Sequence, residues 1–113
     1  MHEYGITESI VGIVSDKARE VGAKRVTRIS VVVGELSGFV PECIEFYFDF
    51  LAKESVAEGA KLDFEIEPVC IRCRSCSFTF QPKDRTWTCP HCQGEDVEIT
   101  GGRDLFVRNM EVE

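Results

Sequence analysis

The pattern of hydrophobic and polar positions predicts two helices in the first half of the chain. Residues 6–21 carry apolar side chains at helical spacing, so we expect a helix there. Thr7 or Ser9 is suited to cap its start and Gly22 to end it. A second helix is expected to begin at Pro41, because proline fits the first turn of a helix. Its apolar positions are Cys43, Ile44, Phe46, Tyr47, Phe50 and Leu51.

Three segments have the composition of strands. Residues 26–33 are rich in β-branched side chains and predict a strand, which residues 34–38 follow as a turn. Residues 61–67 alternate strictly, and their apolar positions, Leu62, Phe64 and Ile66, predict one buried face. A last strand is predicted over Leu105 to Val112, and it could pair with the first sheet. These elements predict an α/β (α+β) fold with two helices packed on a small mixed sheet.

The net charge and the cysteine content of the chain change at Pro68. Residues 1–67 carry 7 basic and 13 acidic side chains, a net charge of −6, whereas residues 70–89 carry 4 basic and 1 acidic, a net +3. Five of the six cysteines lie in residues 70–94. We therefore expect an α/β domain over residues 1–67, completed by a C-terminal strand within 103–113, and a small zinc-ribbon-like β module over residues 68–102.

Composition narrows the class of protein further. The chain has 113 residues, of which 43% are hydrophobic and 29% charged, which is typical of a globular protein. No apolar run approaches the roughly 20 residues of a membrane span, and the first residues do not resemble a secretory signal, so we expect a cytoplasmic protein without a membrane span. A net charge of −7 argues against a protein whose main partner is nucleic acid.

The strongest chemical signal is a pair of Cys-x-x-Cys motifs, Cys73 to Cys76 and Cys89 to Cys92. Each motif places two thiolates on one tight turn, and two such turns facing each other supply the four sulfurs that zinc prefers. Four protein ligands leave no open coordination position, so the predicted zinc is structural. Pro90 and Gly94 favour the second turn. The neighbouring Phe78, Phe80 and Trp87 could back the site with apolar surface.

Three nearby residues have alternative interpretations. Cys70 could replace a ligand of the first motif, but it shares the parity of the buried face of residues 61–67, which favours a small apolar role. His91 lies inside a tight turn between two cysteines, where its side chain should point away from zinc. Cys43 lies on the apolar stripe of the second helix and is expected in the core.

The N-terminus carries a weaker signal. Ni(II) and Cu(II) favour square-planar nitrogen donors, which the Met1 amine, the His2 imidazole and nearby backbone amides can supply as fused chelate rings. Glu3 adds an oxygen donor or an acidic neighbour. On residue type alone, however, a histidine at position 2 is usually just a solvated side chain of a frayed terminus.

Taken together, these motifs resemble the HypA/HybF family of hydrogenase maturation nickel metallochaperones. The resemblance rests on the N-terminal residues Met1-His2-Glu3-Tyr4, on the turn over residues 33–38 and on the two cysteine pairs, and it covers essentially the whole chain. It implies an N-terminal nickel-binding domain that holds Ni(II) for transport at Met1, His2 and Glu3, joined to a domain with structural Zn(II). It also implies the partners, namely a nickel-handling GTPase, the precursor of the [NiFe] hydrogenase large subunit and, in some relatives, urease accessory proteins.

Two other functions compete with nickel delivery. A zinc-ribbon module that binds nucleic acid or protein would use the locally basic segment 70–89, although the acidic remainder would repel a polyanion. A thiol-disulfide enzyme would use Cys-x-x-Cys, but the strand and helix context that lowers a thiol pKa is absent from the sequence pattern. The chain also lacks a phosphate-binding P-loop motif, so any GTP hydrolysis must come from a partner. We therefore expect a carrier and not an enzyme.

Overall fold

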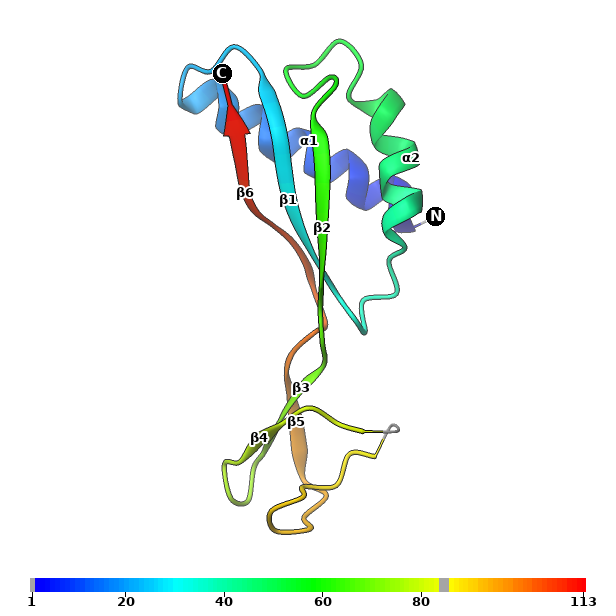
Figure 1. Cartoon of the computed structure of the whole chain (residues 1–113), viewed down its shortest axis with the longest axis vertical. Helices are drawn as coiled ribbons and strands as arrows, with labels where there is room; N and C mark the ends of the chain where they lie inside the picture. Colours follow the sequence, from blue (N-terminus) through cyan, green and yellow to red (C-terminus); the bar gives the residue numbers. More distant parts are fainter. Residues whose placement is uncertain (1, 84–85) are drawn as a thin grey trace. The chain divides into compact units, whose positions relative to one another are not determined.

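The computed structural model describes residues 2–83 and 86–113, and of His2 only the backbone (Figure 1). Its elements are α1 (His2–Glu20), β1 (Val26–Gly34), α2 (Pro41–Leu51), β2 (Lys61–Glu67), β3 (Cys70–Cys73), β4 (Thr79–Phe80), β5 (Val97–Gly101) and β6 (Leu105–Val112). Two helices and two three-stranded sheets confirm the predicted fold class. Neither described helix combines the length and apolarity that crossing a bilayer requires.

The chain divides into two compact units. The first comprises Met1–Val32, Phe39–Glu65 and Phe106–Glu113, and the second comprises Val33–Gly38 and Ile66–Leu105. The turn over residues 33–38 thus belongs with the cysteine-rich segment. The assignment of nickel to one part of the chain and zinc to the other stays a prediction.

In the first unit, helix α1 packs through one apolar stripe. Ile10, Val14 and Ala18, spaced by four residues, are almost completely buried. The helix ends as predicted at Gly22, whose φ of +70° suits glycine, because a side chain in this conformation is strained. The amide of Ala23 donates to the carbonyl of Ala18 and the amide of Gly22 to that of Arg19, which is the Schellman arrangement.

The start of α1 differs from the prediction. The helix begins at His2, not at residue 6, so neither Thr7 nor Ser9 caps it. Thr7 is buried within the helix and its hydroxyl donates to the carbonyl of Glu3. The prediction was wrong because contacts with distant residues extend the helix. The ring of Tyr4 packs against a ring of α2, and such a contact leaves no trace in local sequence.

Strand β1 lies at the centre of the first sheet, whose order is β2-β1-β6. Val31, Val32 and Val33 follow one another in this strand and are all buried. β1 and β2 run in the same direction and are connected through α2, while β6 runs in the opposite direction (Figure 1). The pairing of β6 with β1 confirms that the last strand joins the first sheet, and the result is a mixed sheet.

Helix α2 begins at Pro41 as predicted, but its buried face is narrower than its composition suggested. Only Ile44 and Phe48 are buried, one turn apart. The expectation that Cys43 belongs to the core is wrong, because this residue is exposed. Ile44 and Phe48 are four residues apart and therefore lie one above the other on a narrow face of the helix. Cys43, which directly precedes Ile44, lies off this face and is in solvent. Phe46 and Phe50, which are also exposed, fall outside the buried stripe for the same reason.

Strand β2 has the predicted bounds, yet only the start of its apolar face is covered. Leu62 is buried, Phe64 is partly exposed and Ile66 is 54% exposed. β2 is an edge strand of the sheet, so it has a neighbouring strand on one side only. Period-two alternation identified the strand correctly but not how much of it the helices cover.

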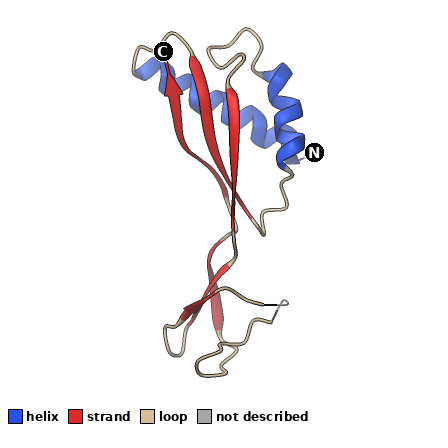
Figure 2. Ribbon diagram, viewed as in Figure 1, coloured by secondary structure: helices blue, strands red, loops and turns tan. Residues whose placement is uncertain are grey.

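The second unit contains a small antiparallel sheet with the order β4-β3-β5, joined by long loops (Figure 2). Ile71 lies opposite Phe80 on one side and Ile99 on the other, and its side chain is completely buried. The second unit also includes a close crossing of two chain segments. A Cβ on Gly34 would lie 2.5 Å from the carbonyl carbon of Gly102, so the crossing requires a residue without a side chain there.

Candidate metal centres

The two Cys-x-x-Cys motifs meet in the second unit. The Sγ atoms of Cys73, Cys76, Cys89 and Cys92 all lie within 4.8 Å of one another. Cys73 and Cys92 are 3.6 Å apart and Cys76 and Cys89 are 3.7 Å apart, measured between sulfurs. Four sulfurs on a tetrahedron around zinc at a bond length of about 2.3 Å are separated by about 3.8 Å. The donor set and its spacing therefore fit a tetrahedral metal ion.

The two turns that carry the cysteines have the same backbone pattern. In each, the first cysteine accepts a hydrogen bond at its carbonyl from the amide four residues later, and its own amide donates to the carbonyl five residues later. In the first turn these partners are Ser77 and Phe78, and in the second they are Gln93 and Gly94. Ser77 and Gln93 also share a positive φ, +67° and +61°. The repeated pattern shows that both turns are built to present two sulfurs each.

Backbone amides around the cluster favour thiolates. The amide of Cys76 has the largest influence on the pKa of Cys73 and, against the effect of burial, lowers it to about 7. The amide of Gly94 likewise lowers the pKa of Cys92, but the neighbouring sulfurs and burial outweigh it and raise the value to about 12. The sulfurs thus compete for negative charge, because four thiolates so close together repel one another. A divalent cation would remove this repulsion.

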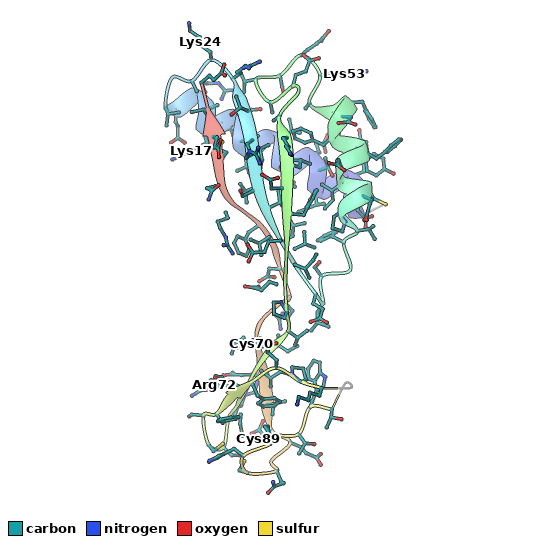
Figure 3. All side chains as sticks on the ribbon, viewed as in Figure 1. Lys17, Lys24, Lys53, Cys70, Arg72 and Cys89 are labelled. Carbon is teal, nitrogen blue, oxygen red and sulfur yellow. The ribbon has the colours of Figure 1, made fainter. Side chains whose placement is uncertain are left out.

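Among the described residues the cluster comprises only these four cysteines. Cys70 lies outside it (Figure 3), is partly buried, and accepts a hydrogen bond at its carbonyl from Thr100. The His91 ring stacks on Phe78, with centroids 5.3 Å apart and an interplanar angle of 18°. The predicted aromatic backing is wrong in part, because Phe78 and Trp87 are 41% and 36% exposed. Within the described part of residues 66–105, the buried hydrophobic side chains are Val69, Ile71, Cys73 and Cys89.

The predicted nickel ligands Met1 and His2 have no described side chains, so their geometry lies outside the described residues. Glu3 is described, and its Oε2 accepts a hydrogen bond from the backbone amide of Val40 at 3.0 Å. Val40 precedes α2 and has no cap from its own side chain. The link between Glu3 and Val40 was missed in the sequence because 37 residues separate the two.

The chain matches one known family along almost its whole length. The family model described as "Hydrogenase/urease nickel incorporation, metallochaperone, hypA" matches residues 1–112. A protein named hydrogenase maturation factor HypA from Dehalococcoides mccartyi is 37% identical over 113 residues, which are 100% of this chain and 95% of that protein. One of the same name from Caldanaerobacter subterraneus is 38% identical over 114 residues and is covered completely, as is this chain.

Two solved structures of similar proteins have the same fold as this chain. A solution structure of a HypA protein superposes with a TM-score of 0.83 at 29% identity, covering 100% of this chain and 97% of that one. The solution structure of the Ni metallochaperone HypA from Helicobacter pylori superposes with a TM-score of 0.73 at 26% identity, covering 97% of this chain and 96% of that one.

These relatives are named as maturation factors or as a metallochaperone, which confirms the expectation that the chain is not an enzyme. The resemblance inferred from the N-terminus and the cysteine pairs is confirmed as well. The chain belongs to the HypA family of nickel metallochaperones that serve hydrogenase maturation.

Proposed function

We propose that this protein binds Ni(II) through Met1, His2 and Glu3 and delivers it to [NiFe] hydrogenase during maturation in the cytoplasm. The observation that carries the proposal is the family match over residues 1–112, which begins with these three residues. Nickel is the cargo of the protein, so a terminal site suits its release better than a buried one. Accordingly, residues 1–67 with the C-terminal strand form the nickel-binding domain and residues 68–102 the zinc-binding domain.

The start of α1 at His2 is compatible with amide ligation. The first four amides of an α-helix have no acceptor within the helix. Deprotonation of the His2 amide by a metal ion would therefore break no helical hydrogen bond. Amine, imidazole and amide must all lose protons to bind, so nickel affinity should fall as pH falls.

The second metal in the proposal is a structural Zn(II) held by Cys73, Cys76, Cys89 and Cys92. The four-sulfur donor set and the sulfur separations of 3.6 and 3.7 Å support zinc. When bound, zinc supplies a fixed link between the two cysteine turns and no open coordination position. The backbone hydrogen bonds from Ser77 and Gln93 to the carbonyls of Cys73 and Cys89 hold the two turns that carry the sulfurs.

The proposed partners are a nickel-handling GTPase and the precursor of the hydrogenase large subunit, with urease accessory proteins as further candidates. Binding of nucleic acid by the zinc-ribbon-like unit is disfavoured. Arg72 pairs with Glu98 at 2.8 Å and Arg74 pairs with Asp96 at 2.8 Å, so much of the local positive charge is neutralised.

A nickel titration tests the proposed site. The native chain, His2→Ala and a version with extra residues before Met1 are each titrated with Ni(II) and followed by calorimetry and absorbance. We expect loss of the tight site in both altered versions. Equal binding in all three would overturn the N-terminal assignment, whereas zinc content measured by elemental analysis reports on the cysteine site independently.

A further inference from the structure

Four aromatic rings form a continuous group on the surface of the first unit. The group, here called the aromatic face, comprises Tyr4 from the first turn of α1 and Phe46, Tyr47 and Phe50 from α2. Tyr4 meets Tyr47 edge-on with centroids 5.4 Å apart. Phe46 meets Tyr47 at 5.4 Å and Phe50 at 6.1 Å. The rings therefore touch one another and act as one surface.

The aromatic face is not explained by the core. Ile44 and Phe48 carry the buried stripe of α2, whereas Phe46 is 66% exposed, Phe50 43% and Tyr4 41%. Exposed apolar surface of this extent, bordered by polar side chains, is typical of an interaction site. Aromatic side chains are also the groups that contribute most to binding energy when a partner covers them.

The two segments that supply the aromatic face carry acidic side chains but no lysine or arginine. Residues 2–16 and 39–52, which supply both helices at this point, contain no lysine or arginine. Helix α2 instead carries Glu42, Glu45 and Asp49, all exposed. Of the labelled basic residues, Lys17 and Lys24 lie toward the far end of α1 from Tyr4 (Figure 3), whereas Lys53 follows Phe50 by three residues just after α2 ends. A complementary partner therefore has a basic border.

The same charges disfavour other occupants. Anionic lipid and nucleic acid would be repelled by the carboxylates of α2. A second copy of the chain would bring the same three carboxylates against its own. What remains is a protein with an apolar pocket bordered by lysine and arginine.

The aromatic face lies beside the proposed nickel site. Tyr4 follows His2 by two residues, and Glu3 connects the first turn of α1 to the backbone just before α2. We infer that the aromatic face is the docking surface for the protein that exchanges nickel with this chain, and that its partner offers an apolar pocket with a basic border. The inference rests on the proposed function, because it takes the N-terminus as the nickel site.

Binding measurements on the full chain test the inference. The purified nickel-handling GTPase and the purified large-subunit precursor are titrated with the native chain and with Phe46→Ala by calorimetry. We expect Phe46→Ala to lose about tenfold or more in affinity for the protein that the native chain binds. Phe106→Ala is the matched control, because Phe106 is 41% exposed on β6, and it should bind as the native chain does. Circular dichroism establishes that both variants are folded.

A second pair of variants tests the charge. Glu45→Lys places a cation beside the aromatic face, and Glu111→Lys makes the same change on β6. We expect Glu45→Lys to weaken binding and to reduce its dependence on salt, with little effect from Glu111→Lys.

Equal affinity of Phe46→Ala and the native chain for both proteins would overturn the inference. A dimer of the native chain that Phe46→Ala abolishes would overturn it too, in favour of a second copy.

Nickel titration of the same variants separates this inference from the proposed function. Phe46→Ala should bind nickel like the native chain, because it alters no proposed ligand. If the native chain binds neither protein, the docking surface and the proposed partners fail together, while its nickel titration still reports the N-terminal site. If nickel binding is unaffected by His2→Ala but Phe46→Ala loses its partner, the surface stands and the nickel assignment fails.

Discussion

The carboxylate of Glu3 accepts a hydrogen bond from the backbone amide of Val40, 3.0 Å away. Glu3 lies in the first turn of α1, and Val40 is the residue before α2. One side chain thus links the starts of the two helices and supplies the cap that Val40 cannot provide itself. A residue predicted as a nickel ligand therefore has a structural contact in the described chain, and the two roles can be separated by substitution.

Glu3→Ala should lower the free energy of unfolding of the first unit by about 1 kcal/mol, the usual cost of losing a helix cap. Glu3→Gln keeps an acceptor for the Val40 amide and should recover most of that loss. Thermal unfolding followed by circular dichroism measures both, and nickel titration of the two variants shows whether the charge matters for metal binding. A melting temperature of Glu3→Ala equal to that of the native chain would contradict the capping role.

Cys73→Ser should lose stoichiometric zinc and the ordered structure of the second unit, because the remaining three sulfurs cannot complete the proposed tetrahedral site. Elemental analysis and hydrogen exchange of residues 70–101 measure the two effects. Cys70→Ser is the control, since Cys70 lies outside the sulfur cluster and should retain zinc. Nickel binding at the N-terminus should be much less affected by either substitution. Loss of zinc from Cys70→Ser to the same degree would mean that the ligand set is wrong.

Zinc binding should release protons, and its affinity should rise with pH. Without metal, the Phe78 amide lowers the pKa of Cys76, but burial and the sulfurs of Cys89 and Cys73 outweigh it, so the pKa is raised. The pKa of Cys92 is raised to about 12, so both thiols carry protons at neutral pH and must lose them to bind zinc. Calorimetry in buffers of different ionisation enthalpy counts the protons. Release of fewer than two near pH 7 would contradict ligation by these thiols.

Two glycines of the first unit should respond to alanine in opposite ways. Gly22→Ala should destabilise the protein by about 1 kcal/mol, because φ is +70° there and the added Cβ has no contact within 4 Å to compensate. Gly12 is exposed in the middle of α1 and its added Cβ would also meet nothing within 4 Å. Gly12→Ala should therefore stabilise the helix by about 0.5–1 kcal/mol. Urea unfolding of both variants measures the difference, and a shift of the same sign in both would refute it.

Local elements were predictable from the sequence because their causes are local. Pro41 and the alternation of residues 61–67 correctly placed α2 and β2, and Gly22 correctly ended α1. The spacing of the four cysteines was enough to predict a zinc site, because each Cys-x-x-Cys turn is formed within a few residues. The N-terminal residues pointed to nickel only through the family that they resemble.

Tertiary structure decided the features that depend on distant residues. The start of α1 moved to His2, where Tyr4 contacts Tyr47 and Glu3 contacts Val40. The buried face of α2 proved narrow, which placed Cys43 in solvent and left the aromatic face exposed. Apolar periodicity tells which side chains could be buried, and the sequence by itself determined that much. Which of them are covered depends on how many neighbouring elements the fold supplies, and α2 has too few to cover more than Ile44 and Phe48.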